Sequence, residues 1–436
     1  MRTRILLTVA ATSLAISAAC ADSEEQPLPE RETPPPSTLD AEVPDATAPD
    51  VDAPDTSLPK CSAAGWCITA FPDADLDFID IWPFEDRAFA IAQSRVEKIK
   101  ILEWQKATDT WQYIDDKTQN EVGVGTFAAR IYAPSEDEIY FTVEPAFVFH
   151  GKRPAAPETG WRWSRQRLPD NIVGHPSTHD HTRYQSSGLA NQVTLGVWGT
   201  GADDVYAHYS NTIFRRNTIN DTWETAYEAS DLGANDHIFF TAVASAGPED
   251  LWFVGGRAIS GESCPLAVRK TADGFTRVAD GIAQGVFNNK CAPRAGTPRI
   301  GNGGGGWLVD VQPSSAGEVL ALYTGYKPDL YAIDGVKLTA MRIEDGGLAY
   351  EQSLVPVKIS QAQPLKVMSS LLHLDGENWF TSWGLVLHGT ADNTFTVSTI
   401  SRDGAPVDGP MHRIRGTSKT NLWAIGARHA YHKTTP

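Results

Sequence analysis

A short unit that recurs along this chain constrains its fold more than any other feature. Each copy is an apolar strand, a turn that carries small and acidic residues, and a second apolar strand. The clearest copies span residues 197–207, 243–255 and 414–426, and weaker ones span 79–91, 131–141, 311–323 and 372–381. Turn residues between alternating apolar positions are typical of paired strands that pack against neighbours. Their recurrence predicts a repeat architecture.

The spacing of the copies predicts the size of each repeat. One residue of the second strand marks each copy, in the order Phe89, Tyr140, Tyr206, Trp252, Leu320, Trp379 and Trp423. Successive markers are 51, 66, 46, 68, 59 and 44 residues apart. A four-stranded propeller blade needs about 40–50 residues, so the longer intervals indicate inserted loops. The sequence therefore predicts an all-β fold, a single β-propeller of about seven four-stranded blades around one hydrophobic hub; six or eight blades also fit the spacing.

A second element follows several copies by about 20–25 residues. It is a polar hairpin tip that leads into an aromatic residue, at 109–111, 221–223, 271–276 and 390–396. These tips resemble degenerate Asp-boxes of sialidase-like propellers, and residues 61–436 resemble bacterial β-propeller lipoproteins of the kelch- and sialidase-like repeat families. In those families the box is a structural hairpin. The resemblance therefore implies the fold and assigns no catalytic residue.

The two ends of the repeat region predict how the ring closes. After Trp423 the chain has room for one more strand, so the last unit lacks its outer strand. Residues 65–71 look like an outer strand without a hairpin of its own, similar to 222–227. We expect this N-terminal strand to complete the last blade, because closure removes two open sheet edges.

The N-terminus has the composition of an export signal. Arg2 and Arg4 precede an apolar run, and Ser17-Ala18-Ala19 precedes Cys20. Residues 17–20 resemble a bacterial lipobox, which predicts a signal peptide over 1–19 and lipidation at Cys20. An ordinary cleaved signal is the alternative. Residues 21–60 carry 11 acidic and 2 basic side chains and many prolines, which predicts a disordered tether over 20–60 ahead of a propeller domain over 61–436.

Charge and cysteine content limit the partners and the compartment. The formal net charge is −17, and residues 61–436 carry −10 with no basic stripe, which argues against nucleic acid as a partner. Four cysteines remain besides Cys20. In an exported chain they predict two disulfides, and local pairing of Cys61 with Cys67 and of Cys264 with Cys291 is favoured among three connectivities.

Few residues have the pattern of a chemical site. His175, His179 and His181 could ligate zinc or copper, although a Pro- and Gly-containing loop is better explained as a solvated insertion. The glycines at 301, 303 and 306 precede a strand and not a helix, so we expect no dinucleotide and no other cofactor. Acidic pairs at 136–137, 203–204 and 249–250 recur with the repeat and are explained by turn chemistry. Trp161, Trp163 and Tyr184 lie in an insertion and could form a contact surface.

No catalytic motif emerges, so catalytic residues are predicted to be none. The favoured interpretation is a cell-envelope lipoprotein, lipid-anchored at the outer membrane or cell surface, whose propeller binds a protein or glycan ligand as a monomer. The alternative is a hydrolase or lyase that acts on carbohydrates or glycoconjugates. An enzyme would show ionisable side chains that converge in the central cleft with shifted pKa values, whereas a scaffold would show an unremarkable channel.

Overall fold

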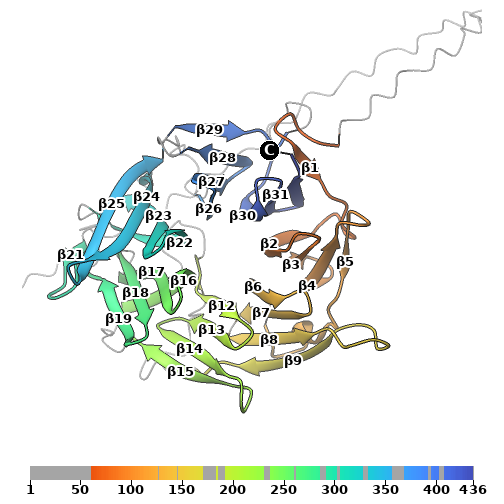
Figure 1. Cartoon of the computed structure of the whole chain (residues 1–436), viewed down its shortest axis with the longest axis horizontal. Helices are drawn as coiled ribbons and strands as arrows, with labels where there is room; N and C mark the ends of the chain where they lie inside the picture. The colour runs from red at the N-terminus through yellow and green to blue at the C-terminus, as the bar shows by residue number, and fades with distance from the viewer. Residues whose placement is uncertain are drawn as a thin grey trace, which may run out of the picture. The chain divides into compact units, whose positions relative to one another are not determined.

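The computed structural model describes residues 60–435 apart from 126, 145, 170–182, 185–191, 230–235, 260–261, 285–290, 302–304, 328–331, 356–367, 391–393 and 402–406. Contacts divide the chain into a unit at 1–56 and a unit at 57–436, and the second unit is the one described below. It is a single β-propeller of seven four-stranded blades (Figure 1). The all-β prediction and the predicted number of blades are thus confirmed.

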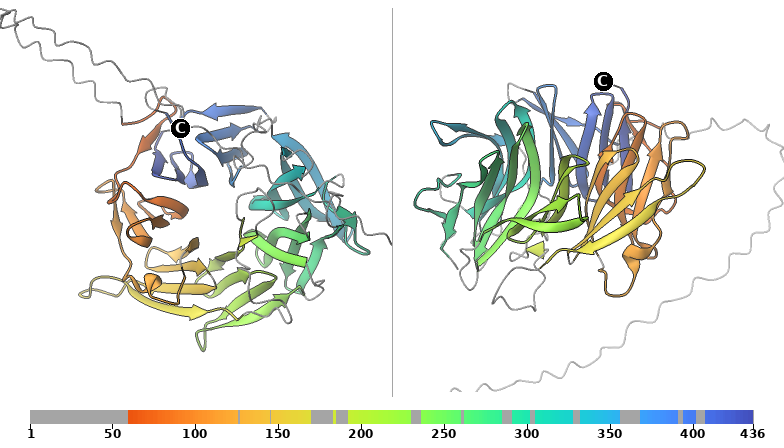
Figure 2. Two further views of the ribbon diagram at one scale, coloured as in Figure 1. Left: turned by 180° about the vertical axis from the view of Figure 1, so that it is seen from behind. Right: turned by 60° about the horizontal axis from the view of Figure 1, so that its bottom comes forward.

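Each blade is an antiparallel meander that begins at the centre of the ring and ends at its rim (Figure 2). The first four blades are β2 (Asp77–Pro83), β3 (Arg87–Ser94), β4 (Lys98–Gln105) and β5 (Thr110–Tyr113); β6 (Phe127–Ser135), β7 (Glu138–Glu144), β8 (Phe147–Lys152) and β9 (Arg162–Arg167); β12 (Leu195–Gly201), β13 (Asp204–Tyr209), β14 (Thr212–Asn217) and β15 (Thr222–Glu228); and β16 (Asp236–Gly247), β17 (Asp250–Ile259), β18 (Glu262–Thr271) and β19 (Gly274–Ala279).

The remaining three blades follow the same order. They are β22 (Gly305–Ser315), β23 (Glu318–Lys327), β24 (Ala332–Glu344) and β25 (Gly347–Val355); β26 (Ser370–Leu374), β27 (Glu377–Ser382), β28 (Leu385–Gly389) and β29 (Phe395–Ser398); and β30 (Met411–Ser418), β31 (Asn421–Gly426), β32 (His429–Lys433) and β1 (Trp66–Ile68). Outside the blades lie two small hairpins and one 3-10 turn: β10 (Arg183–Tyr184) with β11 (Gln192–Val193), β20 (Gly281–Ala283) with β21 (Cys291–Pro293), and η1 (Thr118–Asn120). Within the part of the chain that the structure describes, no helix is long and apolar enough to cross a membrane.

The repeat markers fall where the sequence predicts them. All seven lie on the second strand of their blades, one to a blade. The polar tips at 109–111 and 221–223 form the turns between third and fourth strands. Asp109 and Asp221 adopt left-handed backbone conformations there, at φ 51° and 54°, which short polar side chains tolerate better than most.

The N-terminal strand completes the last blade, as predicted. β1 pairs with β32, and the C-terminus lies beside it (Figure 1). Trp66 is fully buried, its indole N–H donates to Ser398 Oγ of the preceding blade at 2.8 Å, and its ring meets Trp379 edge-on. The disulfide Cys61–Cys67 lies at this strand, and Cys264–Cys291 joins blade 4 to its inserted hairpin. Disulfides of this kind are typical of exported proteins.

The hydrophobic core lies between the blades and not at a central hub. In the described residues, seven clusters of buried apolar side chains each span a boundary between adjacent blades, and an eighth lies between blade 4 and its inserted hairpin. At the boundary of blades 7 and 1, for example, Trp423 packs edge-on against Trp104 and Trp111. The prediction of one shared hydrophobic hub is therefore wrong. A blade has two apolar faces, and each face can be covered only by its neighbour.

The acidic residue ahead of the marker has a role that turn chemistry alone does not explain. In five blades the marker ring lies opposite a basic residue of the third strand, in the pairs Tyr140–His150, Tyr206–Arg215, Trp252–Arg269, Trp379–His388 and Trp423–His432. Two residues before the marker, an acceptor binds that basic side chain. Asp250 pairs with Arg269 at 2.7 Å, and Glu138 lies 2.7 Å from His150. Burial raises the pKa of Glu138, but its hydrogen bonds from His150 and Tyr140 outweigh burial and lower it to about 2.

Ring closure by β1 yields a stability prediction. Removing residues 61–72 should lower the Tm markedly, and Trp66→Ala alone should cost about 3–5 kcal/mol, the range for deleting a large buried aromatic side chain. Chemical unfolding followed by circular dichroism measures both. Val96→Ala, at a side chain that is 79% exposed, is the matched control and should unfold like the wild type. A truncated chain with an unchanged melt would contradict closure by this strand.

Candidate functional site

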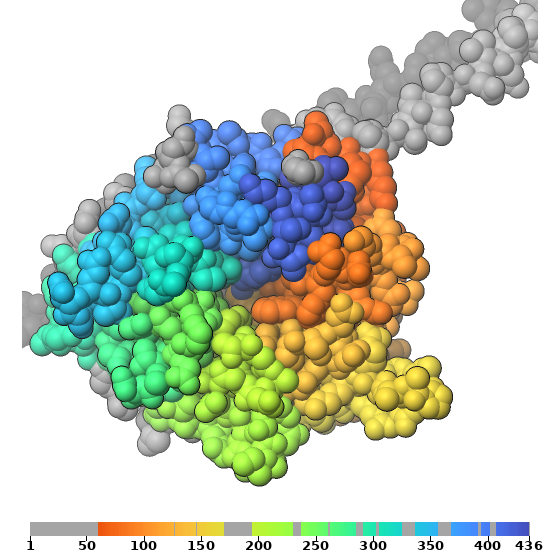
Figure 3. All heavy atoms as spheres, in the orientation of Figure 1, coloured from red at the N-terminus to blue at the C-terminus, as the bar shows by residue number. Residues whose placement is uncertain are grey.

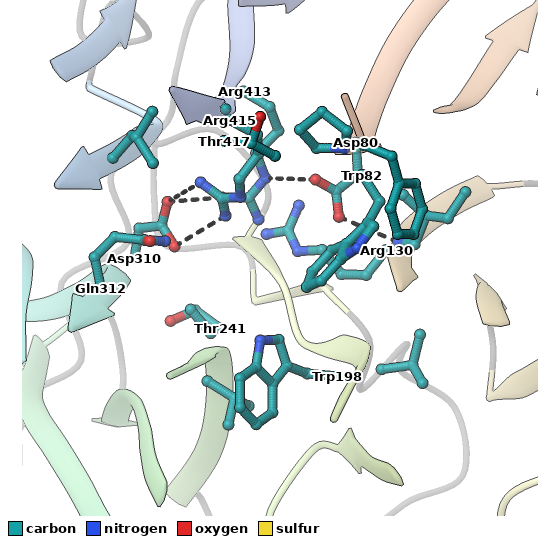
Figure 4. Close-up of a pocket in the computed structure, with 18 of the residues that line it drawn as sticks. Asp80, Trp82, Arg130, Trp198, Thr241, Asp310, Gln312, Arg413, Arg415 and Thr417 are labelled. Carbon is teal, nitrogen blue, oxygen red and sulfur yellow. Dashed lines mark hydrogen bonds and ion pairs between the residues drawn. The ribbon is translucent and has the colours of Figure 1, made fainter. Parts of the chain in front are cut away.

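A cavity of about 420 Å³ lies at the centre of the ring. All seven blades contribute to its wall, mainly through their innermost strands, which converge on the hollow between the blades (Figures 3 and 4). Its lining includes five charged side chains, Asp80, Arg130, Asp310, Arg413 and Arg415. Pockets of this size accommodate small organic molecules. The centre of the ring therefore combines a ligand-sized cavity with a concentration of charged side chains.

An irregularity of the innermost strands puts polar side chains into this centre. The pairing register shifts at the corresponding point of β2, β6, β16, β22 and β30. A shift of this kind is a β-bulge, which bends the strand and redirects one side chain. The polar residues at these points are Asp80, Arg130, Thr241, Asp310 and Arg413.

Most of these polar side chains bond to a neighbouring blade. The contacts run from Asp80 Oδ2 to the Ile131 amide (3.2 Å), from the Thr241 hydroxyl to the Leu308 carbonyl (2.7 Å), from Asp310 Oδ2 to the Leu371 amide (3.0 Å), from Ser370 Oγ to the Ile414 amide (3.3 Å) and from Arg413 Nε to Asp80 Oδ1 (3.2 Å). Each contact joins one innermost strand to that of the next blade around the ring. We call the five side chains that make these contacts, those of Asp80, Thr241, Asp310, Ser370 and Arg413, the channel ring.

The buried charges of the channel ring form one connected cluster. Arg413 pairs with Asp310 at 3.0 Å and with Asp80 at 3.2 Å, and Arg415 pairs with Asp310 at 3.2 Å (Figure 4). The Asp310 and Arg413 side chains are 1% and 2% exposed. Burial by itself raises the pKa of Asp310. The guanidiniums of Arg415 and Arg413 have a larger effect in the opposite direction, and the pKa is lowered to about 2. Asp310 is therefore a permanent anion at neutral pH.

Both carboxylates of the cluster accept hydrogen bonds from the surrounding backbone and are ion-paired with arginines. Asp310 also accepts from the Val311 and Leu371 amides and from the Ser370 hydroxyl. Asp80 accepts from the Ile81 and Ile131 amides and forms an ion pair with Arg413. A carboxylate that is held by backbone amides and arginines is a poor proton donor, base or nucleophile. These two groups therefore serve to hold arginines and backbone.

Arg130 differs from the other cations of the cavity. Its backbone amide donates to Thr142 Oγ1 at 2.9 Å, whereas its guanidinium has no hydrogen-bond or ion-pair partner among the residues that the structure describes. Burial lowers the pKa of Arg130 to about 9, with repulsion by Arg413 as the next cause, against attraction by Asp80 and Asp310. Three guanidiniums thus face two carboxylates, which leaves one positive charge without a counterion.

An aromatic wall flanks this arginine. Trp82 and Trp198 line the cavity from the blades on either side of Arg130, and Tyr132 lies between them, 4.8 Å from the Trp82 ring centre and 6.4 Å from that of Trp198. His208 also lines the cavity, and its Nδ1 lies 3.2 Å from the Thr194 carbonyl. Burial lowers the pKa of His208 to about 3, so the imidazole is neutral and adds no charge.

The site residues predicted from the sequence lie elsewhere. Cys20, His175, His179 and His181 fall outside the described residues, and no group of three metal-binding side chains occurs within 60–435 less its gaps. Trp161 and Trp163 are half-buried between blades 1 and 2, where Trp161 meets Phe89 edge-on and the Trp163 indole donates to the Ile114 carbonyl. These contacts give both indoles a packing role. Tyr184 belongs to β10, and a contact surface that includes it stays a prediction.

The channel residues left a weak signal in the sequence. In each blade a polar residue precedes the marker by 9–12 positions, on the innermost strand or directly before it: Asp80, Arg130, Thr194, Thr241, Asp310, Ser370 and Arg413. The repetition becomes visible only after the markers have been aligned. Aspartates and arginines at equivalent positions of different blades would then suggest a ring of polar contacts.

Comparisons with known proteins identify no family for this chain. No protein-family model matches the chain, and no curated protein matches it significantly. It is similar to the solved WD40 β-propeller domain of Doa1, at 9% identity and a TM-score of 0.45, covering 84% of this chain and 96% of that one.

Two other structures with similar scores come from bacteria. PorZ, a surface component of the type-IX secretion system of Porphyromonas gingivalis, has 12% identity and a TM-score of 0.48, and 83% of this chain is covered. The extracellular domain of a hybrid two-component system, BT3049, from B. thetaiotaomicron has 10% identity and a TM-score of 0.46, with 84% covered. This chain spans 47% and 41% of those two proteins. The propeller assignment therefore depends on the sheet topology described above.

The buried cluster yields a second stability prediction. Asp310→Asn keeps the shape of the side chain but leaves Arg413 and Arg415 without their shared counterion. Removing one partner from a buried ion pair costs about 3–5 kcal/mol, and we expect a loss of that size in urea unfolding at pH 7. Asp86→Asn is the matched control, because its side chain is 70% exposed and its pair with Lys106 is worth little.

The same variant should change the acid limb of the stability curve. The pKa of Asp310 is about 2 in the folded chain and near 4 in the unfolded chain, so the unfolded state binds the proton first. The contribution of Asp310 is therefore complete above about pH 4 and is lost as the pH falls toward 2. Unfolding measured from pH 6 to pH 2.5 should give a shallower loss for Asp310→Asn. Parallel curves for the two proteins would contradict this role.

Proposed function

We propose that this chain is an exported, lipid-anchored binding module whose propeller takes a ligand in its central cavity. The observation that carries the proposal is the composition of that cavity: aromatic rings, an unpaired guanidinium and carboxylates that are already occupied. Such a site offers recognition groups and little acid–base capacity. The signal-like N-terminus, Cys20 and the acidic tether support an envelope location, and the two disulfides support export.

The alternative of a carbohydrate-active hydrolase or lyase receives partial support from the same site. Ionisable side chains do converge on the cavity, and several have shifted pKa values. A glycosidase, however, needs one carboxylic acid that can give up a proton and a second carboxylate that is free to act. Asp80 accepts hydrogen bonds from two backbone amides and is ion-paired with Arg413, and Asp310 accepts hydrogen bonds from arginines, backbone amides and a hydroxyl. The electrostatics therefore favour binding over hydrolysis.

A ligand screen tests the binding proposal. The full chain is screened by thermal shift against sugars, organic acids, phosphates and neutral aromatic compounds, and hits are measured by calorimetry. Trp198→Ala removes part of the cavity wall, and Gln312→Trp fills the cavity. Both should weaken binding of a hit at least about tenfold, which corresponds to loss of one well-packed contact. Val397→Ala, at a side chain that is 56% exposed on β29, should bind like the wild type. Hits that bind all variants equally, or an absence of hits, would contradict the proposal.

The anchor is tested separately. When the chain is expressed in bacteria with a labelled fatty acid, the wild type and Ser23→Ala should carry the label and sediment with membranes. Cys20→Ser should lose both, because the thiol is the attachment point. Label on Cys20→Ser, or none on the wild type, would exclude lipidation at this cysteine while leaving the binding proposal untouched.

A further inference from the structure

Arg130 interrupts the channel ring. It occupies in blade 2 the position that Asp80, Thr241, Asp310 and Arg413 occupy in blades 1, 4, 5 and 7. Those four bond to the innermost strand of the next blade, whereas the Arg130 guanidinium has no partner in the described part of the chain. A side chain that occupies a channel-ring position but does not bond to the next blade is available to a ligand.

The charges around Arg130 define the charge of that ligand. Asp310 is shared by Arg413 and Arg415, and Asp80 is held by Arg413 and two amides. The five groups sum to one positive charge, and the excess lies on Arg130, which has no acceptor among the described residues. A monoanion would complete the balance, whereas a dianion would reverse it and be buried with an uncompensated charge.

We propose that Arg130 anchors a small organic carboxylate whose planar or ring-bearing body lies against Trp82 and Trp198; this identification rests on the proposed function above. The guanidinium fork presents two parallel N–H groups, which match the two oxygens of a carboxylate. The two indoles come from blades 1 and 3, on either side of Arg130 (Figure 4). A cavity of about 420 Å³ has room for both parts of such a molecule.

A stability readout separates this assignment from a structural role. A half-buried guanidinium without a partner in the described residues destabilises the folded chain, and Arg413 repels it. Arg130→Gln should therefore have a Tm equal to or higher than that of the wild type in the absence of ligand. A structural arginine would behave in the opposite way, as Asp310 is expected to do. Arg162→Gln, at an arginine of the same blade that is 69% exposed, is the matched control.

Binding is tested with defined probes on the full chain. Benzoate supplies the carboxylate and the ring, acetate only the carboxylate, benzamide only the ring, and inorganic phosphate a dianion. Benzoate should bind the wild type and Arg162→Gln most tightly. Arg130→Gln should lose about 10- to 100-fold in affinity, the range for a charged hydrogen bond, and Arg130→Lys should be intermediate because it keeps the charge without the fork.

Four outcomes would overturn the inference: a lower Tm for unliganded Arg130→Gln, equal binding of benzamide and benzoate, tighter binding of phosphate than of benzoate, or no binding of any anion. If neutral hits of the wider screen still depend on Trp198, the cavity is a binding site, and only the carboxylate assignment fails.

Discussion

The ion pairs that join Asp310, Arg413 and Asp80 are the constraint on which the centre of this propeller depends. Arg413 belongs to blade 7, yet its guanidinium reaches Asp310 on blade 5 and Asp80 on blade 1. Blades 5 and 7 are not neighbours, so the pairs of Asp310 with Arg413 and with Arg415 connect innermost strands across the channel. Buried charges are costly unless each is paired and hydrogen-bonded. That requirement fixes the relative placement of three innermost strands, and β1 then closes the ring from outside.

Nearly all of the charged groups at the centre of the ring are paired and hydrogen-bonded. The exception, Arg130, is therefore informative. Asp80 and Asp310 accept from amides, hydroxyls and arginines, and Arg415 donates to Asp310, Ser370 and two carbonyls. The Arg130 guanidinium lies at the equivalent strand position without a partner among the residues that the structure describes. A free cation beside a positive neighbour reduces stability, and such features persist mainly where function needs them. Stability and recognition are therefore assigned to different arginines of one cluster.

The sequence predicted the parts of the fold that repeat. Seven markers such as Tyr206 and Trp252 gave the number of blades, and the missing outer strand after Trp423 gave the closure by residues 65–71. It did not predict the channel. One arginine in the strand around residue 130 looks like any polar residue on the exposed face of a strand, and the β-bulge that turns it inward leaves no mark in the local pattern. The hydrophobic hub was wrong for the same reason: apolar periodicity shows that strands are buried, but not which neighbour covers each face.

The acidic turn residues illustrate how one pattern can have two causes. Asp204 and Asp250 do lie at turns, where Asp is common, but they also bind Arg215 and Arg269 of the third strand. The channel carboxylates are likewise committed to arginines and amides. Carboxylates in the described blades thus act largely as fixed acceptors within the fold. The charged group at the centre that remains for a ligand is the guanidinium of Arg130. A cation flanked by indoles recognises the charge and shape of a bound molecule and is poorly suited to proton transfer.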